Sequence, residues 1–278
     1  MHLKRQSGAR RALPLAALAA LGVALGSASP AGAIVTNATF AGSNTEGGKF
    51  RSAEAQFSVS GDNLFITLIN TAPGDVMEPD QLLSSIYFRS SDGTVNLTKA
   101  GGGVFLDGSK VYRNGADVTG TAYGNGGSVG GEFGFRNNLT GGFFGGNSYY
   151  GIGANGMDGF FGAGDLFAGP NLDGPGSPNG MNYGIMSAGD NPLTYNGGIA
   201  NEPIIFNSVK IQLKGASNLD LASILDVQFQ YGTSNSGPRL TTTTLTSVPE
   251  PGAVAFGIVM GGGLLGMVAR GRRRKTAA

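Results

Sequence analysis

The side chains that could do chemistry in this chain are carboxylates, hydroxyls and aromatic rings. The only histidine is His2, and there is no cysteine. Beyond His2 the chain therefore cannot build a Ser-His-Asp triad, a cysteine nucleophile or a zinc site with nitrogen or sulfur ligands. Catalysis by two carboxylates, or a calcium site made of oxygen ligands, is compatible with this composition.

No spacing of the acidic residues defines such a site. Asp158, Asp165 and Asp173, with Asn155 and Asn171 nearby, offer oxygen ligands for calcium in a Gly-rich region. No Asp-x-Asp-x-Asp loop accompanies them, and turn formation is the commoner role of Asp in such surroundings. We therefore predict no catalytic residue, no metal site and no cofactor.

Aromatic residues occur in pairs within the same region, at 143–144, 149–150 and 160–161. Rings of this kind can stack on sugars, which makes Phe143, Tyr149 and Tyr150 candidates for glycan binding. The alternative, which we favour, is that they anchor the loops to the core.

Alternation of apolar and polar residues predicts the strands that must position these groups. The pattern is clearest at 208–214 and 227–231, and it recurs at 55–60 and 85–89. The range 63–70 is apolar on both faces, which predicts a central strand that is covered on both sides.

Two short turn sequences predict hairpins. Gly61-Asp62-Asn63 separates two strand-like runs, and Asp107-Gly108 precedes Lys110-Val111-Tyr112. A short helical turn or an irregular link is expected between 219 and 225.

The range 101–198 holds 30 of the 50 glycines. Ordering glycine costs backbone entropy, so we expect long loops on a β scaffold with short strands such as 132–136, or else disorder. The whole pattern predicts one all-β domain at 34–233, a β-sandwich of jelly-roll-like type with a Gly-rich loop insertion.

The N-terminus has the three parts of a secretory signal peptide. Basic residues at 4, 5, 10 and 11 precede an apolar run at 12–25, and the segment ends in Ala31-Gly32-Ala33. We predict that 1–33 is removed by signal peptidase after export through the Sec translocon.

The C-terminus has three parts of a different kind. Pro249-Glu250-Pro251 precedes an uncharged apolar run of 18 residues at 252–269. At about 1.5 Å per residue this run is long enough to span a bilayer core as a helix. Basic residues follow at once and predict a cytoplasmic tail at 270–275: Arg270, Arg272, Arg273, Arg274 and Lys275.

This C-terminal segment, 248–278, resembles the PEP-CTERM sorting signal of bacterial surface proteins. In that family an exosortase in the membrane cuts near Pro-Glu-Pro and removes the helix. The stretches 82–88 and 224–233 also resemble strands of exosortase-dependent proteins. The resemblance implies an inner-membrane intermediate and then a place at the cell surface or outside the cell. It supplies no catalytic residue.

The segment 234–247 is rich in Ser and Thr and lies between Pro238 and Pro249. We interpret it as an exposed linker, with an edge strand as the alternative. Its run of hydroxyls offers candidate sites for O-glycosylation: Thr241, Thr242, Thr243 and Thr244.

Charge argues against a nucleic-acid partner. Nine of the 19 basic residues lie in the two terminal signals, so the body has ten basic and 17 acidic residues and a net charge of −7. We therefore expect a non-catalytic surface or extracellular-matrix protein that associates with exopolysaccharide, as in a biofilm. The alternatives are a carbohydrate-binding module and a polysaccharide-active enzyme that uses two carboxylates.

Overall fold

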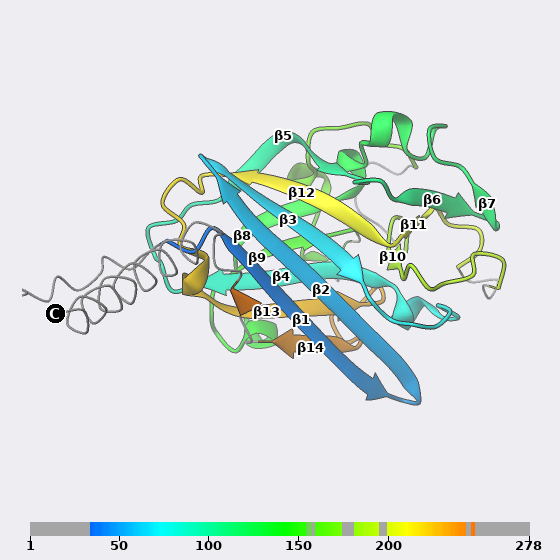
Figure 1. Cartoon of the computed structure of the whole chain (residues 1–278), viewed down its shortest axis with the longest axis horizontal. Helices are drawn as coiled ribbons and strands as arrows, with labels where there is room; N and C mark the ends of the chain where they lie inside the picture. The colour runs from blue at the N-terminus through cyan, green and yellow to red at the C-terminus, as the bar shows by residue number, and fades with distance from the viewer. Residues whose placement is uncertain are drawn as a thin grey trace, which may run out of the picture. The chain divides into compact units, whose positions relative to one another are not determined.

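The computed structural model describes residues 34–154, 156, 159–173, 181–194, 199–242 and 246–247. Within these ranges the chain forms two β-sheets, with short 3₁₀ turns and no α-helix (Figure 1). The prediction of an all-β sandwich is confirmed. The unit that contains every described residue begins at Ile34.

The first sheet has six strands, and all of its pairings are antiparallel. In spatial order they are β15 (Thr246–Ser247), β1 (Asn37–Glu46), β2 (Lys49–Ser60), β3 (Asn63–Asn70), β12 (Ser208–Lys214) and β5 (Thr98–Phe105).

The second sheet has nine strands. Its main path is β14 (Arg239–Thr242), β13 (Ile224–Tyr231), β4 (Leu83–Ser90), β10 (Ile185–Met186), β11 (Ile204–Phe206), β6 (Lys110–Arg113) and β7 (Ala116–Asp117). β9 (Tyr149–Gly153) also pairs with β4, and β8 (Gly134–Leu139) pairs with β9. Among the described strand pairs, only β10 and β11 are parallel.

In the described ranges, six 3₁₀ turns connect these strands. They are η1 (Pro79–Gln81), η2 (Asn125–Gly127), η3 (Gly130–Glu132), η4 (Gly142–Phe144), η6 (Ala163–Asp165) and η7 (Leu221–Ser223). The last of these is the helical turn expected between 219 and 225.

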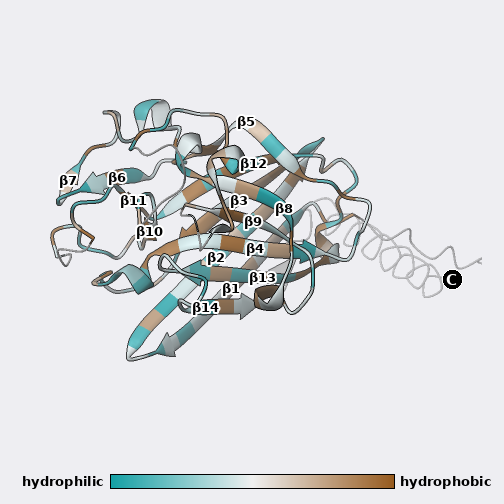
Figure 2. Cartoon of the chain, turned by 180° about the vertical axis from the view of Figure 1, so that it is seen from behind, coloured by the Kyte–Doolittle hydropathy of each residue, from teal (hydrophilic) through white to brown (hydrophobic). Residues whose placement is uncertain are grey.

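The core lies between the two sheets, where apolar side chains of the alternating strands meet. Phe57 of β2 contacts Phe40 of β1 and Phe88 of β4 edge to face, with ring centroids 5.4 and 5.2 Å apart. All three rings are buried. The alternation appears as teal and brown bands along the β1–β2 ribbon (Figure 2). Burial of this apolar face holds the sheets together.

The two-sided cover predicted for 63–70 is wrong. The strand has the expected bounds and a central place between β2 and β12. However, only Leu64, Ile66 and Leu68 are buried with Asn70, while Phe65, Thr67 and Ile69 remain half-buried. The outer face of this sheet is therefore open.

One of the two predicted hairpins forms. β2 and β3 pair across Gly61-Asp62, with Ser60 opposite Asn63. The Asp107-Gly108 turn also forms, with positive φ angles of 48° and 81°. Yet β5 belongs to the first sheet and β6 to the second, so this turn joins the sheets instead of closing a hairpin.

The Gly-rich range is more regular than the expected long loops, because it supplies β6, β7, β8, β9 and β10 to the second sheet. The strand expected at 132–136 begins later, since Glu132 ends η3 and β8 starts at Gly134. Close backbone approach explains one glycine directly. A Cβ on Gly131 would lie 2.0 Å from the carbonyl oxygen of Pro170.

The exposed linker predicted at 234–247 is wrong for its described strand residues, and the edge-strand alternative is confirmed. Arg239–Thr242 forms β14, which pairs with β13, and Leu240 is buried. The final two described residues form β15 in the other sheet, where Ser247 lies opposite Ala38. The domain therefore ends with one strand in each sheet.

Candidate functional site

The three aromatic candidates for glycan stacking are packed into the protein. Tyr149 is 3% exposed, and its hydroxyl donates to Asp226 Oδ2 at 2.8 Å. Tyr150 lies on the opposite face of β9 against Phe88, and its hydroxyl donates to the carbonyl of Val95 at 2.6 Å. Tyr149 is buried and Tyr150 half-buried, and both anchor β9, which is the role that the sequence favoured over stacking on a glycan.

Phe143 is also an anchor. It packs with Phe144 and Phe160 in a second aromatic cluster that is centred on the buried ring of Tyr87. The guanidinium carbon of Arg239 lies 4.3 Å from the Phe143 ring centroid, so one face of the ring is already covered. The aromatic pairs hold the Gly-rich range onto the second sheet, which is the alternative that the sequence favoured.

The candidate threonines differ in accessibility. Thr241 is exposed on β14, whereas Thr242 is 7% exposed and cannot present its hydroxyl to a glycosyltransferase in the folded state. Thr243 and Thr244 lie outside the described residues.

The expected calcium candidates do not form a common site. Asp165 accepts the backbone N–H of Gly162, while Asp173 accepts the side-chain amide of Asn182 at 2.8 Å. Asp158 lies outside the described residues. Among the described residues, no group of three or more acidic or histidine side chains is placed to hold a metal.

A buried polar cluster does form around Glu132 and Asp173. Glu132 is 4% exposed, and its Oε1 accepts the backbone N–H groups of Leu172 and Asp173. Burial raises the pKa of Glu132, and the neighbouring Asp173 charge acts in the same direction. Arg113 Nη1 lies 3.9 Å from Asp173 Oδ1.

Two carboxylates in such different surroundings suggest acid–base chemistry, but the contacts favour a structural role. Glu132 is enclosed, and its Oε1 holds the backbone of 172–173 against η3. Neither of the two surface hollows described below is lined by Glu132 or Asp173. We therefore do not assign a reaction to this pair.

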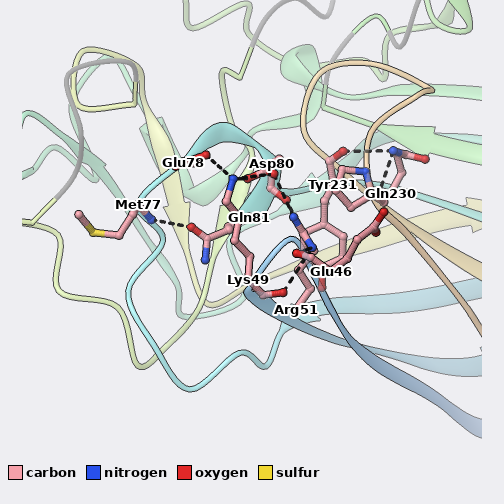
Figure 3. A network of polar contacts seen from close by, with 10 residues as sticks. Glu46, Lys49, Arg51, Met77, Glu78, Asp80, Gln81, Gln230 and Tyr231 are labelled. Carbon is pink, nitrogen blue, oxygen red and sulfur yellow. Dashed lines mark hydrogen bonds and ion pairs between the residues drawn. The ribbon is translucent and has the colours of Figure 1, made fainter.

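A second polar network, which the sequence did not suggest, is centred on Arg51 of β2 (Figure 3). Its side chain is only 2% exposed. It donates to Asp80 Oδ2 at 3.0 Å and to the Asp80 carbonyl at 2.7 Å. Lys49 pairs with the same carboxylate and with Glu78. The network fixes η1 against the β1–β2 hairpin.

The open face of the six-stranded sheet carries the candidate binding surface. Thr39, Gln56, Thr67 and Lys210 are direct neighbours across β1, β2, β3 and β12. They lie in a hollow of about 580 Å³. Its full lining is Asn37, Ala38, Thr39, Gln56, Phe57, Ser58, Thr67, Asp107 and Lys210.

This surface, which we call the open-face hollow, offers hydrogen-bond donors and acceptors of several kinds. Hydroxyl and amide side chains can each donate and accept, as the hydroxyls of a sugar require. Lys210 and Asp107 contribute opposite charges. A polyhydroxyl ligand of low net charge suits this composition better than a strongly charged one.

Asp190, after β10, is a buried carboxylate with a strongly raised pKa. It is 6% exposed, and burial raises its pKa to about 6, with the nearby charge of Asp75 acting in the same direction. Folding therefore favours the protonated form of Asp190 relative to the unfolded chain, and this form predominates below about pH 6.

This shift predicts a loss of stability with rising pH. The folded pKa of Asp190 lies above its unfolded value, so its contribution is fully present below about pH 4 and is lost as pH rises through 6. In metal-free buffer we expect the free energy of unfolding to fall by about 2–3 kcal/mol over this range through Asp190. Asp190→Asn should remove that component in urea titrations at pH 4 and pH 7. An unchanged pH dependence in the variant would contradict the assignment.

The features predicted at the two ends of the chain lie outside the described residues. These are the cleavage site at Ala31 and Ala33, the Pro249-Glu250-Pro251 motif, the apolar run at 252–269 and the basic tail at 270–275. Within the described part of the chain, no helix has the length and apolar character needed to cross a membrane.

Comparison with known proteins gives no match. No family model matches the chain, and neither a curated protein nor a solved structure is significantly similar to it.

Proposed function

We propose that this chain is the precursor of an exported, non-catalytic surface or matrix protein that an exosortase processes. The main support for this proposal is the order of segments along the chain. A predicted signal peptide is followed by a folded unit and then by Pro-Glu-Pro, an apolar run and a basic tail. The extent of the folded unit supports this order. β1 begins four residues after Ala33, and β15 ends two residues before Pro249.

The pairing of these two strands also supports processing at both ends. β15 pairs with β1, so the first and last described strands of the domain lie side by side. Removal of either terminal signal would leave this pairing intact. The processed domain would therefore keep both sheets.

We further propose that the processed protein contacts neutral polysaccharide through the open-face hollow. The row of hydroxyl and amide groups across β1, β2 and β3 supports this choice of ligand, and the buried state of Tyr149 argues against the ring-stacking alternative. If the open-face hollow binds polysaccharide, a carbohydrate-binding module and a matrix protein would differ only in their affinity for that polysaccharide. A second hollow contains two carboxylates, Asp75 and Glu78, but Glu78 is paired with Lys49, and Asp75 accepts from the Asn191 N–H and the Thr194 hydroxyl. These contacts argue against a two-carboxylate enzyme at that hollow.

The polysaccharide proposal predicts that Gln56→Ala combined with Thr67→Ala weakens binding about tenfold or more. Each change removes hydrogen-bonding groups worth about 0.5–1.5 kcal/mol from the centre of the hollow. Migration in gels that contain dextran or another neutral glucan, with hyaluronate as the anionic comparison, measures the effect.

Ser43→Ala is the matched control, because Ser43 is an exposed hydroxyl on β1 outside the hollow. All three positions are half-buried or exposed, so stability should change by less than about 0.5 kcal/mol per site. Equal retardation of the double variant and the wild type would contradict the assignment of this surface.

A further inference from the structure

Two loops beside the second sheet are joined by hydrogen bonds. One loop follows β3 and contains Gly74 and Asp75, and the other follows β10 and contains Ser187 and Asp190. The Ser187 hydroxyl donates to the carbonyl of Gly74 at 3.3 Å. The Asn191 N–H donates to Asp75 Oδ1 at 3.0 Å. These contacts hold the two aspartates near each other.

The second observation is that the Asp190 carboxylate is buried, at 6% exposed, without a hydrogen bond to either oxygen from the described residues. The backbone N–H groups of Val76 and Asn191 favour its ionised form without reaching hydrogen-bond geometry. A buried carboxylate in this state is costly unless it takes up a proton or a cation.

No described lysine or arginine compensates this negative charge. Asp75 also lines a surface hollow of about 400 Å³ together with Lys49 and Glu78. Lys49 is already paired with Glu78 and Asp80. This hollow also gives an ion a route from solvent to Asp75.

We propose that Asp75 and Asp190 bind a calcium ion between these loops. The available ligands are all hard oxygens: two carboxylates and the carbonyl of Gly74, with water completing the coordination sphere. Calcium accepts irregular sets of six to eight oxygens, whereas magnesium requires near-ideal octahedral geometry. With only two carboxylates as charged ligands, we expect a dissociation constant for calcium of about 0.1–1 mM, as is typical of extracellular modules. The proposal does not depend on polysaccharide binding.

Calcium titration of the full chain, kept in mild detergent because of its apolar C-terminal run, tests the proposal. At pH 7.5 we expect 10 mM CaCl₂ to raise Tm by about 5 °C relative to EDTA. Calorimetric titration should give one site per chain. MgCl₂ at the same concentration should raise Tm by less than half as much.

Asp190→Asn and, separately, Asp75→Asn should abolish the calcium-dependent shift, whatever they do to Tm in EDTA. Asp62→Asn is the control, because Asp62 is an exposed carboxylate in the β2–β3 turn. It should keep the full shift. The proposal is overturned if the wild type melts at the same temperature in CaCl₂ and EDTA. It is also overturned if the Asp190→Asn variant keeps the shift.

Discussion

Replacing Asp80 with alanine is expected to lower the free energy of unfolding by about 3–5 kcal/mol. Arg51 is 2% exposed, and Asp80 is the only carboxylate that pairs with it in the described part of the chain. Without Asp80, the guanidinium keeps only backbone carbonyls as partners, including those of Glu46 and Lys49. A buried charge that has lost its counter-ion is strongly destabilising. The midpoint of urea unfolding measures the loss.

Glu78→Ala is the matched control for this prediction. Glu78 contacts the same Lys49, but its side chain is 51% exposed, so the pair is screened by solvent. Its loss should cost about 1 kcal/mol or less. The double variant Arg51→Met with Asp80→Ala removes the buried guanidinium together with its half-buried carboxylate partner and should recover part of the loss. Equal costs at positions 78 and 80, or purely additive costs in the double variant, would contradict the assignment.

Replacing Glu250 with glutamine is expected to block processing of the C-terminus. In the proposed function, Glu250 is the only charged residue of the Pro-Glu-Pro motif that the exosortase recognises. The variant should keep its apolar run and basic tail and remain with the membrane fraction. We expect the extracellular amount to fall at least tenfold. Immunoblots of membrane and culture fractions, with an antibody to the domain, measure the distribution.

Glu202→Gln is the control for this experiment, because it makes the same chemical change within the domain, in the turn before β11. It should leave processing unchanged. Release of the Glu250→Gln protein at the wild-type level would show that this motif does not direct cleavage.

Strands with a clear alternation of apolar and polar residues could be predicted from the sequence. β3 has the predicted bounds, and β12 and β13 contain the predicted ranges. Alternation predicts a strand because one face of each is buried. β3 is apolar on both faces, but Phe65 and Ile69 of its outer face remain half-buried. Apolar residues on both faces therefore did not require cover on both sides.

Pairings between distant segments could not be predicted in the same way. An Asp-Gly turn has the same local chemistry whether its strands pair or diverge, so the sequence did not show that β5 and β6 lie in different sheets. β15 depends on a partner about 200 residues away along the chain, whereas β14 pairs with β13 across only 9 to 15 residues. A Thr-rich segment has the same composition as a spacer or as an edge strand.

The burial of Arg51 was not predicted, although the pattern of β2 indicates it. Arg51 has the same phase in β2 as Ala53, Ala55 and Phe57, which face the core. Extending that alternation by one step would have placed its guanidinium inside and required a buried partner. Asp190 had no such signal, because its burial arises from the contact of two loops.

Intact-mass measurement of the protein in the extracellular fraction tests the proposed processing most directly. The account predicts a single folded product that starts at Ile34 and ends near Pro249-Glu250-Pro251, without the apolar run and the basic tail. A product that begins at Met1, or one that still carries the residues up to Ala278, would contradict it.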